Sequence, residues 1–250
     1  MEVLPQVKSA SVVPYTINAK NEILFLLGLE GYAHGWRESG KWGVFGGKIE
    51  KSDLCAEYGA ARECYEETAG CLMSHGELRQ KLKQGDFALA LDAIFKKTRS
   101  VYYFVQVPYA DYPAFFRNTK QFVQYCGGKV DCIEKTQLKW VSINQLRREL
   151  APPPPPPPPS SRHGFANFNQ RRPVFRRKFI EVMRFFYDHN GFQYLYTGNS
   201  HAVSKYIYFH VDMGASGGAS GGASDETSAC ENAQESRARE KCYLLRHENK

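Results

Sequence analysis

Residues 62–67 read Arg62-Glu63-Cys64-Tyr65-Glu66-Glu67 and place three carboxylates within five positions. On a helix that turns by about 100° per residue, Glu66, Glu63 and Glu67 lie at about −60°, 0° and +40° and so share one narrow face. Like charges at this spacing repel each other, so a purely structural helix gains nothing from the arrangement. A bound divalent cation would offset the repulsion, because hard cations take oxygen ligands.

The surrounding residues predict a helix over 53–68, with Asp53 as its N-cap. The apolar positions fall on the opposite face, at about 160° to 220°, and are expected to be buried. They are Leu54, Tyr58, Ala61 and Tyr65. The alternative is a solvated acidic face, which is what most charge clusters are. The apolar back face and the nearby Gly46-Gly47 pair favour a functional cluster instead.

The segment resembles the Nudix box, the signature of a family of metal-dependent pyrophosphohydrolases. In this chain the pattern begins at Gly47, Asp53 stands where the family has glutamate, and the gap before Arg62 is one residue longer. Ala69 occupies the usual glycine position and Gly70 arrives one residue late, which predicts a helix extended by one residue. The approach over 41–50 and the stretch 140–146 also resemble the strands of Nudix domains.

The resemblance implies an α+β fold, a Nudix-type α/β/α sandwich with a mixed sheet, forming one domain plus flexible extensions. It implies Mg²⁺ or Mn²⁺ as cofactor, and a metal site made by Glu63, Glu66, Glu67 and Gly47. Glu63 is also expected to act as general base, and Arg62 is expected to orient a glutamate by a charge-assisted hydrogen bond. Further residues are candidates for contact with substrate: Gly46, Lys48, Glu50, Glu134, Arg171 and Arg172. In some Nudix enzymes a late-loop acid completes the site, and the resemblance implies either Glu134 or Asp131 for that role.

The predicted reaction is hydrolysis of a nucleoside diphosphate linked to another moiety, such as a nucleotide sugar, a dinucleoside polyphosphate or an RNA cap. The basic stretch 162–178, which includes Arg171 and Arg172, motivates the RNA option. The alternative is a catalytically weak Nudix-like binding module, which acts through nucleotide or RNA binding and through docking of its polyproline segment.

Composition limits the other classes of protein. The 250 residues are 42% hydrophobic and carry a net charge of +7, which favours anionic ligands. No apolar run is long enough to cross a membrane and no secretory signal is visible, so a cytoplasmic or nuclear location is expected. The 7 cysteines include no C-x-x-C pair, which argues against a zinc site or a disulfide framework. Nudix relatives are often dimers, so a homodimer is one expectation.

The chain divides by composition into a predicted Nudix domain over 1–190 and two C-terminal segments. Eight prolines at 152–159 form an insertion within that domain, extended as polyproline II and open to proline-binding domains. Residues 191–213 are an extension in which 192–196 and 206–211 are expected to form a hairpin or a partner surface, and 214–250 are expected to be disordered. Strands are predicted at 9–18, 23–29, 101–107 and 138–142, and further helices at 74–83, 114–125, 143–150 and 173–187.

Overall fold

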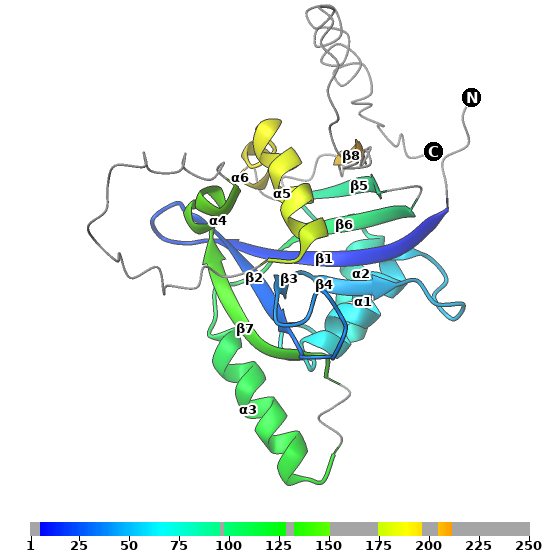
Figure 1. Cartoon of the computed structure of the whole chain (residues 1–250), viewed down its shortest axis with the longest axis vertical. Coiled ribbons are helices and arrows are strands. Elements are labelled where there is room, and N and C mark those ends of the chain that lie inside the picture. The colour runs from blue at the N-terminus through cyan, green and yellow to red at the C-terminus, as the bar shows by residue number, and fades with distance from the viewer. Residues whose placement is uncertain (1–5, 96–97, 129–132, 151–174, 197–204, 212–250) are drawn as a thin grey trace, which may run out of the picture.

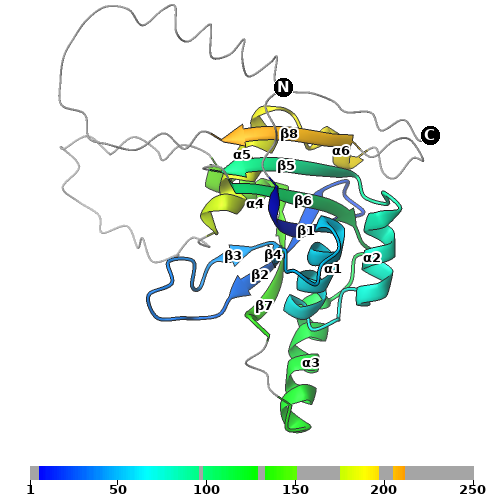
Figure 2. The same cartoon turned by 90° about the vertical axis from the view of Figure 1, so that its right-hand side faces the viewer.

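The computed structural model describes residues 6–95, 98–128, 133–150, 175–196 and 205–211. In this part of the chain one mixed sheet lies between helices on its two faces (Figure 1, Figure 2). The predicted α+β class with a mixed sheet is therefore confirmed.

The strands of the sheet are β1 (Val7–Ile17), β2 (Ile23–Glu30), β3 (Trp42–Gly43), β4 (Phe45–Lys48), β5 (Leu89–Phe95), β6 (Thr98–Gln106), β7 (Lys135–Ser142) and β8 (Lys205–Val211). The helices are α1 (Ala56–Glu67), α2 (His75–Lys83), α3 (Tyr112–Tyr125), α4 (Ile143–Leu150), α5 (Arg177–Asp188) and α6 (Gln193–Tyr196).

Strand β1 organises the sheet, because it pairs with three other strands. Its first half is antiparallel to β4, with Ala10 opposite Gly47, and its second half is antiparallel to β2. Along its other edge it runs parallel to β6. Strand β2 carries β7 along its far edge, and the short β3 pairs with Gly28 and Leu29 on the edge that also carries β1. Strands β5 and β8 extend the sheet beyond β6. Strands β2, β4 and β7 therefore meet at one end of the sheet beside α1 (Figure 1).

Alternating side chains of the strands fill two separate cores. Along β6, Val101 and Tyr103 belong to the core that α1, α2 and α3 cover. Tyr102 and Phe104 belong to the core under α4, α5 and α6, where Phe104 stacks on Phe186 with ring centroids 4.9 Å apart. This two-residue alternation is what a strand buried on both faces requires. The result is a three-layer arrangement, helices over sheet over helices.

Most predicted elements are present with small shifts in their ends. Ser74 caps α2 by accepting a hydrogen bond from the Glu77 backbone N–H, and Pro113 lies in the first turn of α3. Helix α5 begins at Arg177. Strand β5 was not predicted, and the strand that the resemblance implies over 41–50 is divided into the short strands β3 and β4.

The hairpin predicted from 192–196 and 206–211 is wrong. Residues Gln193–Tyr196 form helix α6, and β8 pairs in parallel with β5, with Ile207 opposite Leu91. The β-branched and aromatic residues of β8 favour a strand, but local sequence does not reveal which strand is its partner. The proline run at 152–159 and the tail at 214–250 lie outside the described residues, so those predictions and the domain limits stay predictions.

Candidate active site

Helix α1 turns a different face to the sheet from the one predicted. Its buried residues are Gly59, Ala60, Ala61, Cys64 and Glu67, whereas Leu54 and Tyr65 are exposed. The buried face is thus centred about 70° from the carboxylates instead of opposite them. Small side chains let the helix approach β1 and β4 closely. As a consequence Glu67 belongs to both faces, and its carboxylate lies in the interior.

The start of α1 also differs from the prediction. The N-cap is Cys55, which makes no side-chain capping bond, and Asp53 instead accepts hydrogen bonds from Arg62. Gly59, on the same side of the helix, makes room for this carboxylate, since a Cβ there would be 3.1 Å from Asp53 Oδ2. Asp53 therefore anchors Arg62 and does not cap the helix.

Arg62 holds together the outer part of the acidic cluster. Its Nε and Nη2 donate to the two Asp53 oxygens at 3.2 and 3.0 Å, and its Nη1 donates to Glu63 Oε1 at 3.0 Å and Glu66 Oε2 at 3.3 Å. The hydrogen bonds from Arg62 lower the pKa of the Asp53 carboxyl below its usual value. Burial raises the pKa of Glu63, and the Arg62 charge opposes that rise. Arg62 also donates to the Lys48 backbone carbonyl, which ties α1 to β4.

The two glycines of β4 lie directly against the carboxylates of α1. The Gly46 N–H donates to Glu67 Oε2 at 2.7 Å. A Cβ on Gly47 would lie 2.5 Å from Glu63 Cδ, so only glycine lets this carboxylate rest on the strand. A Cβ on Gly46 would lie 2.4 Å from the Ala10 carbonyl oxygen of β1. Each glycine therefore makes room for a different neighbour, whereas the roles predicted for Gly46 and Gly47 toward a substrate or metal stay predictions.

A chain of buried charges continues inward from Glu67. Lys135, whose side chain is 0% exposed, places Nζ 2.9 Å from Glu67 Oε1 and also contacts Glu30 Oε1. Arg176 Nη1 reaches the same Glu30 oxygen at 2.8 Å. Burial raises the pKa of Glu67 to about 7, and the Lys135 ammonium opposes that rise. Two carboxylates and two cations thus balance in this inner group.

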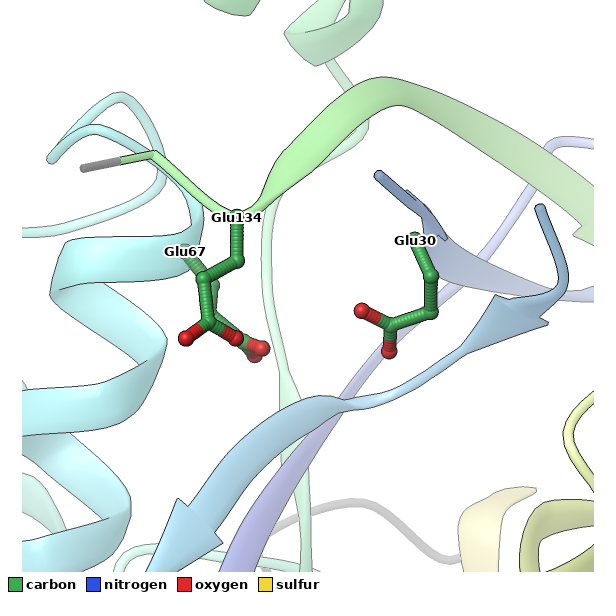
Figure 3. Close-up of side chains that lie close together, drawn as sticks. All are labelled: Glu30, Glu67 and Glu134. Carbon is green, nitrogen blue, oxygen red and sulfur yellow. The ribbon is translucent and has the colours of Figure 1, made fainter. Parts of the chain in front are cut away.

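Glu134 stands across from α1 at the start of β7. Carboxylate oxygens of Glu30, Glu67 and Glu134 lie within 4.8 Å of one another. Figure 3 shows the oxygens of Glu67 and Glu134 side by side, with Glu30 facing them from β2. The Gly31 N–H donates to the Glu134 backbone carbonyl at 2.9 Å and fixes the chain at this point.

These residues fit a divalent metal. Glu63, Glu66, Glu67 and Glu134 offer oxygen donors only, which are the ligands that Mg²⁺ and Mn²⁺ prefer. The missing side chain at Gly47 leaves the space that the Glu63 carboxylate uses. Glu66 is the most open of the three box glutamates, with a side chain that is 53% exposed.

The remaining predicted residues are placed less centrally or are not described. Glu50 lies at the edge of the outer cluster, 3.9 Å from Arg62 Nη1. Lys48 is exposed and contributes its carbonyl to Arg62. Arg171 and Arg172 lie outside the described residues, as do Asp131 and most of the basic stretch 162–178.

The last residues of that stretch make contacts within the chain. Arg176 binds Glu30, the Arg177 backbone N–H donates to Glu38, and Lys178 Nζ lies 5.6 Å above the Phe95 ring. These three positions contribute to the fold around the start of α5.

Sequence reasoning missed Glu30 and Lys135, and it counted Arg176 only as part of the basic stretch 162–178 and not as a partner of Glu30. Glu30 and Lys135 each stand at the end of a strand, where a charged residue is an ordinary boundary signal. The only sequence hint is that Glu30 follows a continuous apolar run over 23–29. Nothing local indicates that these residues, far apart in sequence, form one buried group.

Comparison with known proteins gives structural likenesses at low sequence identity. No protein-family model matches the chain, and no curated protein sequence matches it. A NUDIX hydrolase from Nitrosomonas europaea is 11% identical, with 84% of this chain and 81% of that one covered and a TM-score of 0.39. A MutT protein from Methanosarcina mazei Go1 is 21% identical, with coverage of 58% and 83% and a TM-score of 0.33. A Nudix hydrolase from M. smegmatis is 9% identical, with coverage of 77% and 91% and a TM-score of 0.38.

Two of these solved structures are thus described as Nudix hydrolases and one as a MutT protein. At these TM-scores the likenesses carry no argument of their own. The fold rests on the sheet and helices described above, and the site rests on its own geometry. Among the described residues, no helix has the length and apolar character needed to cross a membrane.

Proposed function

We propose that this chain is a metal-dependent pyrophosphohydrolase that cleaves a nucleoside diphosphate linked to another moiety, with Mg²⁺ or Mn²⁺ as cofactor. The observation that carries the proposal is the gathering of Glu63, Glu66 and Glu67 on one end of α1, against the glycines of β4 and facing Glu134. A divalent ion held there would neutralise phosphate oxygens and activate water for attack at phosphorus.

The chain's own residues are assigned distinct roles. Glu63 takes a proton from water, a role supported by its partial burial, which raises the pKa of its carboxyl. Arg62 is a positioning residue, since it donates to Asp53, Glu63 and Glu66 together. Glu66 and Glu134, both exposed, are assigned to the ion on the side from which a substrate approaches.

The test is release of phosphate or nucleotide from a panel of nucleotide sugars, dinucleoside polyphosphates and capped RNA, with Mg²⁺, Mn²⁺ or EDTA. Hydrolysis is expected with either metal and is expected to stop in EDTA. Glu63→Gln is expected to lower kcat by about 10²- to 10⁴-fold, the usual contribution of a general base.

Glu57→Gln, the same change in the first turn of α1 outside the acidic cluster, is the matched control and should keep wild-type activity. Full activity in a Glu66→Gln, Glu67→Gln double variant, or hydrolysis that EDTA does not affect, would remove the mechanism.

An RNA cap is the substrate option that the basic stretch 162–178 supports. Because phosphate contacts release counterions, RNA binding through this stretch should weaken steeply as salt increases. Binding that is absent or insensitive to salt would favour a small nucleotide instead. A homodimer is checked in the same preparations by analytical ultracentrifugation.

The second candidate is a Nudix-like binding module without turnover. It is favoured by the pairing of Glu67 with Lys135, which uses one box glutamate inside the chain. In that case nucleotides bind but are not hydrolysed across the whole panel, and a proline-binding domain is captured through residues 152–159. Hydrolysis of any panel member at a rate that depends on Glu63 excludes this candidate.

A further inference from the structure

Lys135 occupies a position where a cation would be expected. Its ammonium lies 2.9 Å from Glu67 Oε1 and also contacts Glu30, two of the three carboxylates whose oxygens lie within 4.8 Å of one another. Its side chain and that of Glu30 are 0% and 1% exposed, so water does not screen the group. Two unpaired carboxylates this close together and this deeply buried would repel each other strongly.

The fold is built to admit this lysine. Lys135 is the first residue of β7 and pairs with Glu30, the last residue of β2, across a register shift between Leu29 and Glu30. Two residues earlier on β2, a Cβ on Gly28 would lie 2.9 Å from Cγ and Cδ of Lys135. The aliphatic part of Lys135 therefore crosses β2 where there is no side chain, and its ammonium reaches the carboxylates.

The charges of the inner group, which consists of Glu30, Glu67, Lys135 and Arg176, balance without an added ion. When both carboxylates are ionised, Glu30 and Glu67 contribute two negative charges, and Lys135 and Arg176 contribute two positive charges. Both oxygens of Glu67 already have partners in the protein, because Oε1 contacts Lys135 and Oε2 accepts from the Gly46 N–H at 2.7 Å. By contrast, Glu66 and Glu134 are exposed, and the only positive group that contacts Glu63 or Glu66 within the described residues is Arg62.

We propose that Lys135 is a positioning residue that replaces a cation between Glu67 and Glu30, so that Glu67 serves the fold and the metal is held by Glu63, Glu66 and Glu134. The assignment of the metal to the outer carboxylates rests on the proposed function. The assignment of Lys135 rests on contacts within the chain. The two parts fail separately in the experiments below.

The first experiment removes the lysine charge with Lys135→Met, which keeps an unbranched side chain. The matched control is Lys139→Met, the same change at an exposed position of the same strand. Mn²⁺ stoichiometry is measured by electron paramagnetic resonance, and thermal unfolding is followed with and without Mn²⁺.

Lys135→Met is expected to bind one more Mn²⁺ per chain than wild type. It should unfold at lower temperature than wild type without metal and recover most of that difference with Mn²⁺. Lys139→Met should match wild type in both measurements. An unchanged stoichiometry together with an unchanged effect of Mn²⁺ on unfolding would overturn the role given to Lys135.

The second experiment stands even where Lys135→Met does not fold. In Glu67→Gln one of the two carboxylate oxygens becomes an NH₂ group. This donor must face either the Gly46 N–H or the Lys135 ammonium, which are donors themselves, so thermal stability falls. The Mn²⁺ affinity of Glu67→Gln should nevertheless stay within about three-fold of wild type. Glu66→Gln should lose at least about ten-fold in Mn²⁺ affinity, because Glu66 is one of the carboxylates assigned to the metal. Equal losses of affinity in the two variants would contradict the division of roles.

These outcomes separate the inference from the proposed function. A wild-type chain that binds no Mn²⁺ and hydrolyses nothing defeats the proposed function, while a gain of Mn²⁺ binding in Lys135→Met still supports the position given to Lys135. A hydrolase that needs Mn²⁺, in which Glu67→Gln loses metal as strongly as Glu66→Gln, keeps the proposed function and overturns the inference.

Discussion

Replacing Gly47 by alanine should separate the function of this site from the stability of the fold. The new Cβ would lie 2.5 Å from Cδ and Oε1 of Glu63, far inside contact distance. The group that must yield is the end of a flexible side chain, and Gly47 has no unusual φ that alanine would strain. The Glu63 carboxylate therefore moves away and the strand stays in place.

The Gly47→Ala substitution has two opposing effects on the free energy of unfolding. Forcing Glu63 off its rotamer costs about 1 kcal/mol. Replacing glycine by alanine at a compatible position stabilises the fold by about 0.4 to 1 kcal/mol, because the unfolded chain has less conformational entropy to lose. Stability should therefore change by less than about 1 kcal/mol, whereas a displacement of about 1 Å at a catalytic group costs about 100-fold in rate.

The assay is kcat/KM on the substrate that wild type hydrolyses in the panel above, alongside urea unfolding. Gly46→Ala is the contrasting variant, since its Cβ would lie 2.4 Å from backbone atoms of Ala10 and Ser11. It should lose about 2 to 3 kcal/mol of stability, because backbone cannot move aside cheaply.

A double-mutant cycle with Glu63→Ala tests whether Gly47→Ala lowers the rate by displacing the Glu63 carboxylate. Shortening Glu63 removes the atoms that collide with the new Cβ, so Gly47→Ala should cost nothing further in that background. A further 100-fold loss in the Glu63→Ala background would refute the account, as would a stability loss as large as that of Gly46→Ala.

Three further changes have defined outcomes. Ala69→Gly should raise the free energy of unfolding by about 1 kcal/mol in urea denaturation, because Ala69 has φ +52° and non-glycine residues are strained there; no change would show that the turn relaxes. Arg62→Met should cost about 2 kcal/mol at neutral pH, since Asp53 loses its partner. The pKa of Asp53 is lowered in the fold, so this contribution is fully present above the ordinary aspartate pKa and is lost as pH falls through the lowered pKa of the folded state. Urea unfolding over this pH range is the measurement, and a stability difference between wild type and Arg62→Met that stays constant down to acid pH would contradict the assignment. Glu134→Gln should weaken Mn²⁺ binding by about ten-fold in calorimetry while stability changes by less than about 0.5 kcal/mol, because the side chain is exposed; unaltered affinity would remove Glu134 from the site.

The elements that carry the candidate site are local features, and for that reason sequence predicted them well. The spacing of Glu63, Glu66 and Glu67 places their carboxylates together on any helix, whatever it packs against. The Gly46-Gly47 pair was likewise singled out by its nearness to the acidic segment in the sequence. Glu134, just before a predicted strand, was also a candidate.

The orientation of α1 was predicted incorrectly, for a physical reason. Hydrophobic periodicity assigned Leu54 and Tyr65 to the core, but small residues such as Ala60 and Ala61 allow the helix to lie close to β1 and β4. Close packing by small side chains produces little hydrophobic signal. The predicted cap at Asp53 and the extended helix end failed similarly, because Arg62 takes the carboxylate of Asp53 and Ala69 adopts a positive φ that ends the helix at Glu67.

The sequence alone determined the acidic face of α1 and indicated the glycine strand beside it and the class of chemistry that we propose, because these depend on spacing along one segment. Only the tertiary structure decided which glutamates face inward. Glu67 is drawn to Lys135 because β2 and β7 pair with Glu30 opposite that lysine, and Gly28 leaves space for its side chain. Contacts between strands more than 100 residues apart arise from the pairing of the sheet, and no local pattern in the chain records that pairing.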